Sequence, residues 1–258
     1  MLKAITRDVS ASLSDCELSF VDRRPIDVAT ARLQHAAYRQ ALTALGCTVI
    51  ELPALDAMPD AVFVEDVAVV VDEIAVMTRP GVESRRSEGA AVAAVLAGCR
   101  QLRHIQAHGT LDGGDVLRVG RRVFVGQGAR TNPEGIAQLA GHLRPLGYAV
   151  QAVPTRHCLH LKSAVTQVGE DTLLIQPRWI DREAFAGYRL IEVDPDEEHA
   201  ANALLIGEGG VIHPACFPRT GERLQRGGIH VVPVDLSELQ KAEGATTCCS
   251  IVLRASGE

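Results

Sequence analysis

The sequence lacks any long apolar segment. The N-terminal stretch MLKAITRDVS has no apolar core of the kind that a signal peptide carries. No later run approaches the roughly 18 apolar residues that a membrane-spanning helix needs. Because neither export nor membrane insertion is signalled, we expect a cytoplasmic location and no membrane partner.

Clusters of positive charge are also missing. The 258 residues carry a formal net charge of −6, and basic residues occur in nothing longer than pairs such as Arg23–Arg24 and Arg85–Arg86. A nucleic-acid-binding protein needs a basic patch that neutralises phosphates, so this absence argues against a nucleic-acid partner. The composition, 47% hydrophobic and 22% charged, is typical of a globular protein, and we expect its ligand to be a small molecule.

The cysteines form no disulfide framework. Their number is odd and they are scattered along the chain, at Cys16, Cys47, Cys99, Cys158, Cys216, Cys248 and Cys249. This distribution predicts reduced thiols, most of them small core residues. No linker rich in proline, glycine or serine divides the chain either, so we expect one domain over residues 1–258. The sequence determines no oligomeric state, and a homodimer stays open.

What the sequence does contain is a repeat of strands and helices. Paired apolar strands around short turns are predicted at residues 62–81, 113–128, 162–177 and 201–218. Helical patterns are predicted at residues 28–46, 88–99, 132–147 and 221–228, and strands follow them at residues 48–54, 102–107, 148–154 and 229–235. The repeated unit is therefore a hairpin, a helix and a strand.

The repeat predicts a closed ring of five units. One landmark residue near the start of each hairpin recurs about every 42 to 48 residues, at Glu65, Asp112, His160, Asn202 and Cys248. The fifth hairpin has only the C-terminal CCSIVL, so its partner should be the N-terminal LKAITRDV, which would close the ring without leaving an open edge. We expect the landmark residues to point toward one central channel.

Two of the landmark stretches are acidic. PDAVFVED places Asp60, Glu65 and Asp66 in an apolar stretch, interpreted as a strand, where each buried carboxylate must be neutralised. The neutralising group is either Arg85 or Arg86, or a guanidinium or ammonium ligand whose N–H donors suit carboxylates. TLDGGDV offers Asp112 with a second aspartate around two glycines, a pattern that by itself usually marks only a turn.

The other two stretches carry histidine and cysteine. In HCLHLKS, residues three apart in an extended segment point to opposite faces, so His157 and His160 should not share a metal ion. The same alternation in TTCCS, taken as a strand, lets only one of Cys248 and Cys249 face a pocket. Both thiols could be packing residues, but a thiolate beside a histidine can attack the electrophilic carbon of a guanidinium.

Together these stretches resemble the dimethylarginine dimethylaminohydrolases, a branch of the guanidino-group-modifying superfamily. Six motifs occur in the family's order and spacing, and these are Met58–Val70, Thr78–Arg86, Thr110–Leu117, Arg130–Asn132, Leu159–Ser163 and Thr247–Ser250. The resemblance implies an α/β fold, a five-bladed α/β propeller of ββαβ repeats around a central channel, also called the pentein fold.

The resemblance also implies site residues. Cys248 would be the nucleophile, His160 the general acid and base, and Asp112 the carboxylate that orients it. Substrate-binding roles are implied for Asp60, Glu65 and Asp66 at the guanidinium, for Arg85 and Arg130 at the α-carboxylate, and for the backbone carbonyls of Leu18 and Ala242 at the α-ammonium. The implied reaction is hydrolysis of Nω,Nω-dimethyl-L-arginine, or of the monomethyl form, to L-citrulline and an amine, with no cofactor.

Three alternatives stay open. An arginine deiminase-like hydrolase of another guanidino compound is the nearest, although such enzymes commonly carry an aspartate where Lys162 stands. A non-catalytic propeller that serves as an interaction module would have no need for the catalytic set. A zinc-binding module would use Cys248, Cys249, His157 and His160.

We expect a mobile cover over the site in the stretch of small polar residues at positions 10–20.

Overall fold

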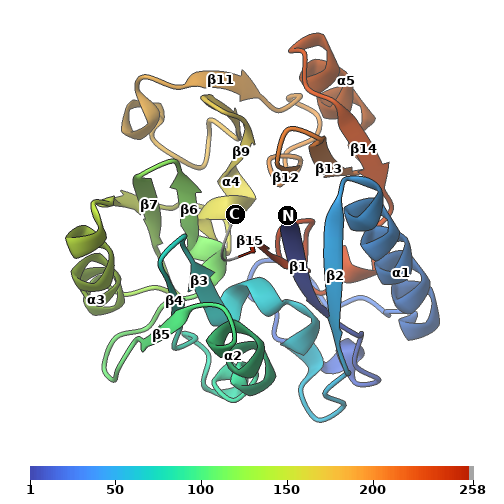
Figure 1. The fold of residues 1–258 in the computed structure, drawn as a ribbon. Coiled ribbons are helices and arrows are strands. Elements are labelled where there is room, and N and C mark those ends of the chain that lie inside the picture. Colours follow the sequence, from blue (N-terminus) through green and yellow to red (C-terminus); the bar gives the residue numbers. More distant parts are fainter. Residues whose placement is uncertain (256–258) are drawn as a thin grey trace.

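Five small sheets surround a common centre (Figure 1). The computed structural model describes residues 1–255, and within them each sheet has three strands. In sheet order, from the innermost strand outward, the strands are β3 (Ala68–Val70), β4 (Ile74–Met77) and β5 (Gln101–His104); β6 (Val116–Val119), β7 (Arg122–Gln127) and β8 (Ala149–Pro154); β9 (Val165–Gly169), β10 (Thr172–Ile175) and β11 (Arg189–Glu192); β12 (Leu204–Ile206), β13 (Gly210–Pro214) and β14 (Val231–Val234); and β15 (Ile251–Arg254), β1 (Leu2–Arg7) and β2 (Cys47–Leu52).

Every sheet follows the predicted connectivity. The inner and middle strands are antiparallel, and the middle and outer strands are parallel. Parallel neighbours need a crossover connection. The described helices of at least eight residues supply it in four units, and they are α1 (Val28–Ala44), α2 (Ala90–Ala97), α3 (Pro133–Leu143) and α5 (Pro218–Arg226). The predicted five-bladed α/β propeller of ββαβ units is therefore confirmed.

The third unit departs from the repeat. Between β10 and β11 the chain forms only the 3-10 turn η7 (Arg182–Phe185) in place of an α-helix. Phe185 of this turn is fully buried, and its ring centroid lies 4.8 Å from that of Phe124 on the neighbouring sheet. A single aromatic contact thus covers part of the area that a helix covers in the other units.

The predicted closure of the ring is confirmed. Strand β1 pairs with β15 in antiparallel register, with Leu2 opposite Arg254 and Ile5 opposite Ile251. Strand β1 consequently starts near the centre of the ring (Figure 1), and Ala255, the last described residue, donates its backbone N–H to Met1 O at 2.9 Å. The first and last strands of the sequence complete one sheet, so the ring leaves no unit half-built.

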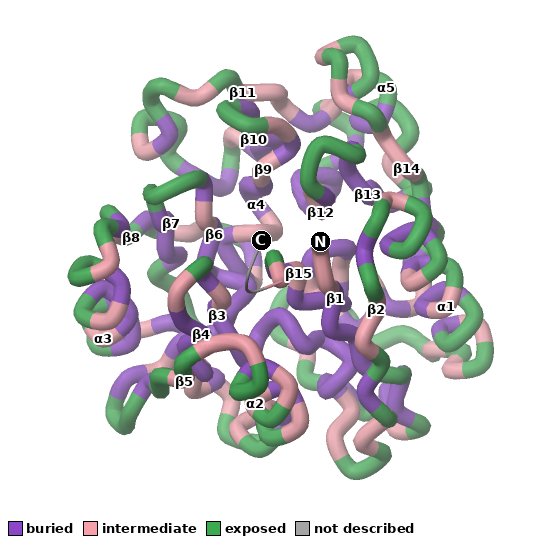
Figure 2. Tube along the Cα trace, viewed as in Figure 1, coloured by how far each residue is buried: buried purple, intermediate pink, exposed green. Residues whose placement is uncertain are grey.

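The hydrophobic core is divided among the gaps between neighbouring sheets. Each of five buried clusters joins residues of two adjacent units, as when Val76 of β4 and Val125 of β7 belong to one cluster. The middle strands such as β4, β10 and β13 are therefore buried on both faces, which explains their nearly continuous apolar runs, whereas outer strands such as β5 and β8 are largely exposed. Figure 2 shows the buried residues inside the ring and the exposed ones along its outer helices.

The remaining short helices lie in the segments that connect the strands and the longer helices. They are α4 (Leu161–Ala164), α6 (Ser237–Gln240) and the 3-10 turns η1 (Leu13–Asp15), η2 (Pro59–Val62), η3 (Val64–Val67), η4 (Glu83–Arg85), η5 (Gly113–Asp115) and η6 (Arg144–Leu146). None of the helices in the described part of the chain is long and apolar enough to span a bilayer.

Two predicted strand boundaries are wrong. The stretch with Glu65 and Asp66 forms the 3-10 turns η2 and η3, and its strand starts only at Ala68. Likewise β15 starts at Ile251, so both cysteines precede it in a turn. The alternation of a strand therefore does not decide which thiol faces a pocket. In an extended strand the polar side chains would alternate between two faces. The tight turns direct them instead toward the neighbouring units of the ring.

Candidate active site

Polar side chains near the starts of the five units form a belt around the centre. Each joins its own unit to a neighbour, and the contacts in order around the ring are Gly114 N to Asp66 Oδ1 at 3.0 Å, Leu161 N to Asp115 Oδ1 at 2.9 Å, Asn202 Nδ2 to Lys162 O at 3.0 Å, Thr247 N to Asn202 Oδ1 at 3.0 Å, and Thr247 Oγ1 to Glu65 Oε2 at 2.7 Å. The belt thus contains the landmarks Glu65 and Asn202, and residues one to three positions from the landmarks Asp112, His160 and Cys248.

The predicted acid and base pair lies in this belt. His160 directly precedes α4, and its Nε2 is 3.0 Å from Asp112 Oδ2, a carboxylate with no exposed surface. Burial disfavours the charged imidazolium, but the carboxylates of Asp66, Asp112 and Asp115 outweigh it and raise the pKa of His160 to about 9. The imidazole therefore holds a proton at neutral pH and can donate it.

A second ion cluster lies next to the histidine. Arg85 is buried and donates to Asp66 Oδ2 at 2.8 Å and to Glu88 Oε2 at 2.9 Å. Burial raises the pKa of Asp66, yet His160 and Arg85 lower it by more, to about 2. Burial raises the pKa of Glu88 to about 7 despite the same arginine. Arg85 thus neutralises Asp66 within the chain, which agrees with one of the two open interpretations, while Glu65 of the same stretch is paired with Lys162.

The predicted nucleophile faces a small enclosed cavity of about 20 Å³. The residues that line it are Glu17, Asp60, Phe63, Asp66, Arg85, Arg130, Leu159, His160, Ala242, Glu243 and Cys248. Cys249 instead lies in the hydrophobic core with no exposed surface. The two neighbouring thiols therefore face different surroundings. The turn that holds them produces this difference, and the alternation of a strand does not.

The thiol of Cys248 is protonated at neutral pH. Burial, together with the carboxylates of Glu65 and Asp66, raises its pKa well above the ordinary value. Lys162 opposes this shift only weakly. A bound cation close to the sulfur would lower the thiol pKa again, so an activated thiolate requires a positively charged ligand in the cavity.

Residues 17–21 cover the cavity. Oε1 of Glu243 accepts the backbone N–H groups of Ser19, Phe20 and Val21 at 2.5 to 3.0 Å. Ser19 Oγ also accepts a hydrogen bond from Arg130 Nη2 at 3.0 Å. A space of about 20 Å³ holds about one water molecule. A ligand of amino-acid size therefore enters only after this segment moves.

The predicted cover and the predicted role of Leu18 fit this arrangement in part. Leu13 and Cys16 are fully buried, so the first half of the stretch at positions 10–20 belongs to the core and does not cover the cavity. Leu18 packs against the same core cluster and does not line the cavity, whereas Glu17 beside it does. Ala242 lines the cavity at the place where the sequence predicts it.

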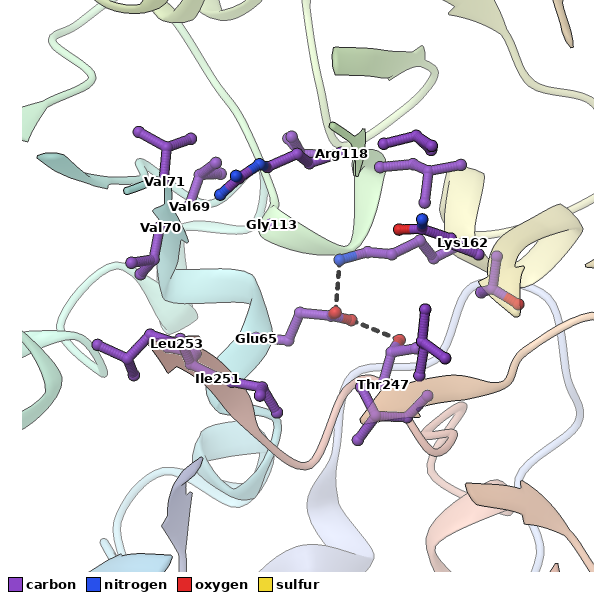
Figure 3. A pocket seen from close by; sticks show the side chains of 18 of the residues that line it. Glu65, Val69, Val70, Val71, Gly113, Arg118, Lys162, Thr247, Ile251 and Leu253 are labelled. Carbon is purple, nitrogen blue, oxygen red and sulfur yellow. Dashed lines mark hydrogen bonds and ion pairs between the residues drawn. The ribbon is translucent and has the colours of Figure 1, made fainter. Parts of the chain in front are cut away.

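Glu65 faces the opposite side of the belt. Its carboxylate forms an ion pair with Lys162 and accepts a hydrogen bond from Thr247 (Figure 3). All three line a separate, larger cavity of about 680 Å³. The prediction that the Glu65 side chain meets the guanidinium of a substrate does not agree with this position. The adjacent residue Asp66 is the carboxylate that lines the small cavity.

The geometry does not support the zinc-binding alternative. Within residues 1–255, the group of histidine, cysteine, aspartate and glutamate side chains close enough to hold a metal ion is Asp66, Asp112 and His160, whose ligand atoms lie within 4.8 Å of one another. Cys249 is in the core, and His157 lines another cavity, so neither joins Cys248 and His160.

Comparison with known proteins identifies the family. The family model for arginine deiminase matches residues 53–201. The N(G),N(G)-dimethylarginine dimethylaminohydrolase of Streptomyces coelicolor is 41% identical over 254 residues, which cover 98% of this chain and 97% of that protein. The protein of the same name from Pseudomonas aeruginosa is 35% identical over 249 residues, or 96% and 97% of the two chains.

The chain belongs to the dimethylarginine dimethylaminohydrolase family.

Solved structures of the dimethylarginine dimethylaminohydrolase family share its architecture. A mutant of the Pseudomonas aeruginosa protein complexed with citrulline matches with a TM-score of 0.92 at 34% identity, covering 98% of this chain and 100% of the other. Another family structure, an adduct with S-methyl-L-thiocitrulline, has the same TM-score, identity and coverage. The N-terminal domain of a cyanobacterial arginine dihydrolase shares the fold, with a TM-score of 0.85 at 18% identity over 98% of both chains.

Two acidic side chains near the site of this member of the dimethylarginine dimethylaminohydrolase family were not predicted from the sequence. Glu243 had no signal as a single acidic residue in a polar stretch, yet it holds the cover. Glu88 is the second partner of Arg85. It lies three residues further along the chain, a spacing that marks a possible pair on a helical turn.

Proposed function

We propose that the chain hydrolyses Nω,Nω-dimethyl-L-arginine, and the monomethyl form, to L-citrulline and dimethylamine or methylamine. The observation that carries this proposal is that Cys248, His160 and Asp66 line one small closed cavity. Membership of the dimethylarginine dimethylaminohydrolase family supports it, as does the citrulline bound in a solved relative.

Charge complementarity supports an arginine-like substrate. Asp60 and Asp66 supply carboxylate oxygens to the cavity, and these suit a guanidinium. Arg130 lies at the cover side of the cavity and would exchange its hydrogen bond to Ser19 for the substrate α-carboxylate. Arg85 is already held by Asp66 and Glu88, so its part is mainly to fix the orientation of Asp66, with the carboxylate of the substrate as a further partner.

The chemistry follows from the protonation states. The thiol of Cys248 loses its proton to solvent as the cationic substrate binds, because His160 is already protonated, and the resulting thiolate adds to the guanidinium carbon. His160 donates its proton to the departing amine, and a planar thiouronium cation remains on the sulfur. Water then attacks the same carbon while His160 takes the proton from it. Collapse of that adduct releases citrulline and regenerates the thiolate, and Asp112 holds the imidazole in place throughout.

A methylated substrate fits better than free arginine. Lys162 lines the far cavity and is bound to Glu65, so position 162 offers the substrate no acceptor. A site built to hydrogen-bond both edges of an unmodified guanidinium rejects analogues that lack an N–H strongly. Without the second acceptor, a nitrogen that carries two methyl groups leaves no polar group unpaired.

One kinetic comparison tests the proposal. The purified protein is incubated with dimethylarginine, monomethylarginine, arginine and agmatine, and citrulline and the released amine are both measured. We expect the highest kcat/KM with the methylated arginines and no turnover by Cys248→Ser. Preferred turnover of arginine would instead favour the deiminase alternative, and no turnover of any of the four would contradict the proposal.

The cytoplasmic location stays a prediction from the sequence, and a homodimer stays open.

A further inference from the structure

The fourth landmark of the repeat has no role in the chemistry derived above. Asn202 precedes β12 and is 4% exposed. Its Nδ2 donates to Lys162 O and to Thr247 Oγ1, both at 3.0 Å. Its Oδ1 accepts from Thr246 Oγ1 at 2.7 Å and from Thr247 N at 3.0 Å. Both donors and both lone pairs of the amide are therefore used.

These four hydrogen bonds connect the two segments that carry the reacting groups. Lys162 lies two residues after His160, at the start of α4. Thr246 and Thr247 immediately precede Cys248. Among the described residues, the only other side chain that bonds to both segments is that of Glu65, through its ion pair with Lys162 and its hydrogen bond from Thr247 (Figure 3). The Asn202 amide bonds the backbone of both segments, whereas the Glu65 side chain bonds only their side chains and its backbone N–H donates to Cys248 O at 3.2 Å.

We propose that Asn202 is a positioning residue that sets the distance and orientation of the Cys248 sulfur relative to the His160 imidazole. This inference rests on the proposed function, because it assigns Asn202 to the geometry of that reaction. The turn of Cys248 has no regular strand pairing of its own, since β15 starts only at Ile251. Its position therefore depends on side-chain hydrogen bonds such as these and on the backbone hydrogen bond from Glu65 N to Cys248 O.

The amide is also the right group electrostatically. The carboxylates of Glu65 and Asp66 already raise the pKa of the Cys248 thiol. An aspartate at position 202 would have nearly the same shape but would add a further buried negative charge, and it would lose both N–H donors. Asparagine supplies donors and acceptors together without opposing formation of the thiolate.

The test compares Asn202→Asp with Thr220→Val. Thr220 is fully buried in α5, and its hydroxyl accepts the backbone N–H of Asp194 at 3.0 Å, away from the site. Thr220→Val therefore controls for the loss of a buried polar contact. For both variants we measure kcat and KM with dimethylarginine, the melting temperature, and the pH dependence of Cys248 alkylation by iodoacetamide, located by mass spectrometry.

We expect Asn202→Asp to lower kcat by about 100-fold with KM within about threefold, because a misplacement of about 1 Å costs that much. Its alkylation profile should move to higher pH. Thr220→Val should lower only the melting temperature. A kcat of Asn202→Asp within twofold of the wild type, or a loss of activity with an unchanged alkylation profile, would overturn the assignment.

A milder variant keeps the test decisive if Asn202→Asp does not fold. Thr246→Val removes one of the four hydrogen bonds and preserves the shape of the side chain. We expect about a tenfold lower kcat with little change in KM, and an unchanged kcat would reject the proposal.

The alkylation measurement needs no substrate. Failure of the wild type to form citrulline would reject the proposed function, while an alkylation shift in Thr246→Val, which adds no charge, would still support the positioning role. An unshifted profile in an active enzyme would reject the positioning role alone.

Discussion

Two neighbouring carboxylates, those of Glu65 and Asp66, face opposite sides of the belt. Asp66 faces the small cavity, where it meets Arg85, His160 and the backbone N–H of Gly114. Glu65 faces the larger cavity, where it meets Lys162 and the hydroxyl of Thr247. Both are buried, and they are adjacent in the sequence.

Their pKa values move in opposite directions. Burial raises both, but His160 and Arg85 outweigh it at Asp66 and lower that pKa to about 2. At Glu65 burial outweighs Lys162, and the pKa is raised. The difference shows that burial alone does not create a reactive site. The number of neighbouring cations makes the difference. Asp66, at the small cavity, lies beside His160 and Arg85, whereas Glu65, on the far side, lies beside Lys162 alone.

Replacement of the nucleophile should have the largest effect. Cys248→Ser removes the sulfur that lines the small cavity, and we expect turnover to fall below about one thousandth of the wild type. Cys249→Ser changes a thiol in the core and should retain most of the activity, with a lower melting temperature. Citrulline formation and thermal denaturation measure the two effects. Equal losses of turnover in both variants would contradict the assignment of Cys248.

Asp112→Asn tests the histidine on the same side. We expect kcat to fall by about 100- to 10,000-fold, as in other catalytic sets where the orienting carboxylate is replaced. The wild-type imidazolium loses its proton as pH rises through about 9, so activity that needs a proton donor should decline there. The variant removes a negative charge from His160, and its decline should occur at lower pH. A pH–rate profile that does not move would exclude Asp112 as its partner.

Lys162→Met tests the far side. The change leaves the buried Glu65 carboxylate without its cation, which should cost about 3 kcal/mol of unfolding free energy. The double variant Lys162→Met with Glu65→Gln should recover most of this loss, because no buried charge remains. Urea denaturation measures both. A large loss of kcat in the double variant with normal stability would show that the far side takes part in the chemistry.

Arg130→Ala should have the smallest effect and acts on substrate binding. Its Nη2 donates to Ser19 Oγ and its Nη1 lies 3.9 Å from Asp112 Oδ2, so it has fewer charged partners than Arg85 and can receive an α-carboxylate. We expect KM for dimethylarginine to rise about tenfold or more, since hydrogen bonds to charged groups contribute about 1.5–3 kcal/mol. The rise should be smaller for agmatine, which lacks the carboxylate. Arg130→Lys is the matched control, because it keeps the charge without the planar fork.

The sequence predicted more of the fold than of the side-chain directions. Apolar runs and their spacing identified the repeated unit, and the unpaired CCSIVL predicted the pairing of β1 with β15. The proposed catalytic set of Cys248, His160 and Asp112 follows from motifs in the sequence. The surroundings of Glu243 could not, because its partners, the N–H groups of Ser19, Phe20 and Val21, lie more than 220 residues away in the chain.

By itself the sequence determined the five units, the closure of the ring and the polar residues of each landmark stretch. These depend on local periodicity and on a repeat that recurs along the chain. Only the tertiary structure decided which side of the belt each side chain faces. Residues 59–67 and the segment before Ile251 form tight turns. In such turns adjacent side chains point in different directions, so Glu65 meets Lys162 while Asp66 meets Arg85. Contacts with other units decide these directions.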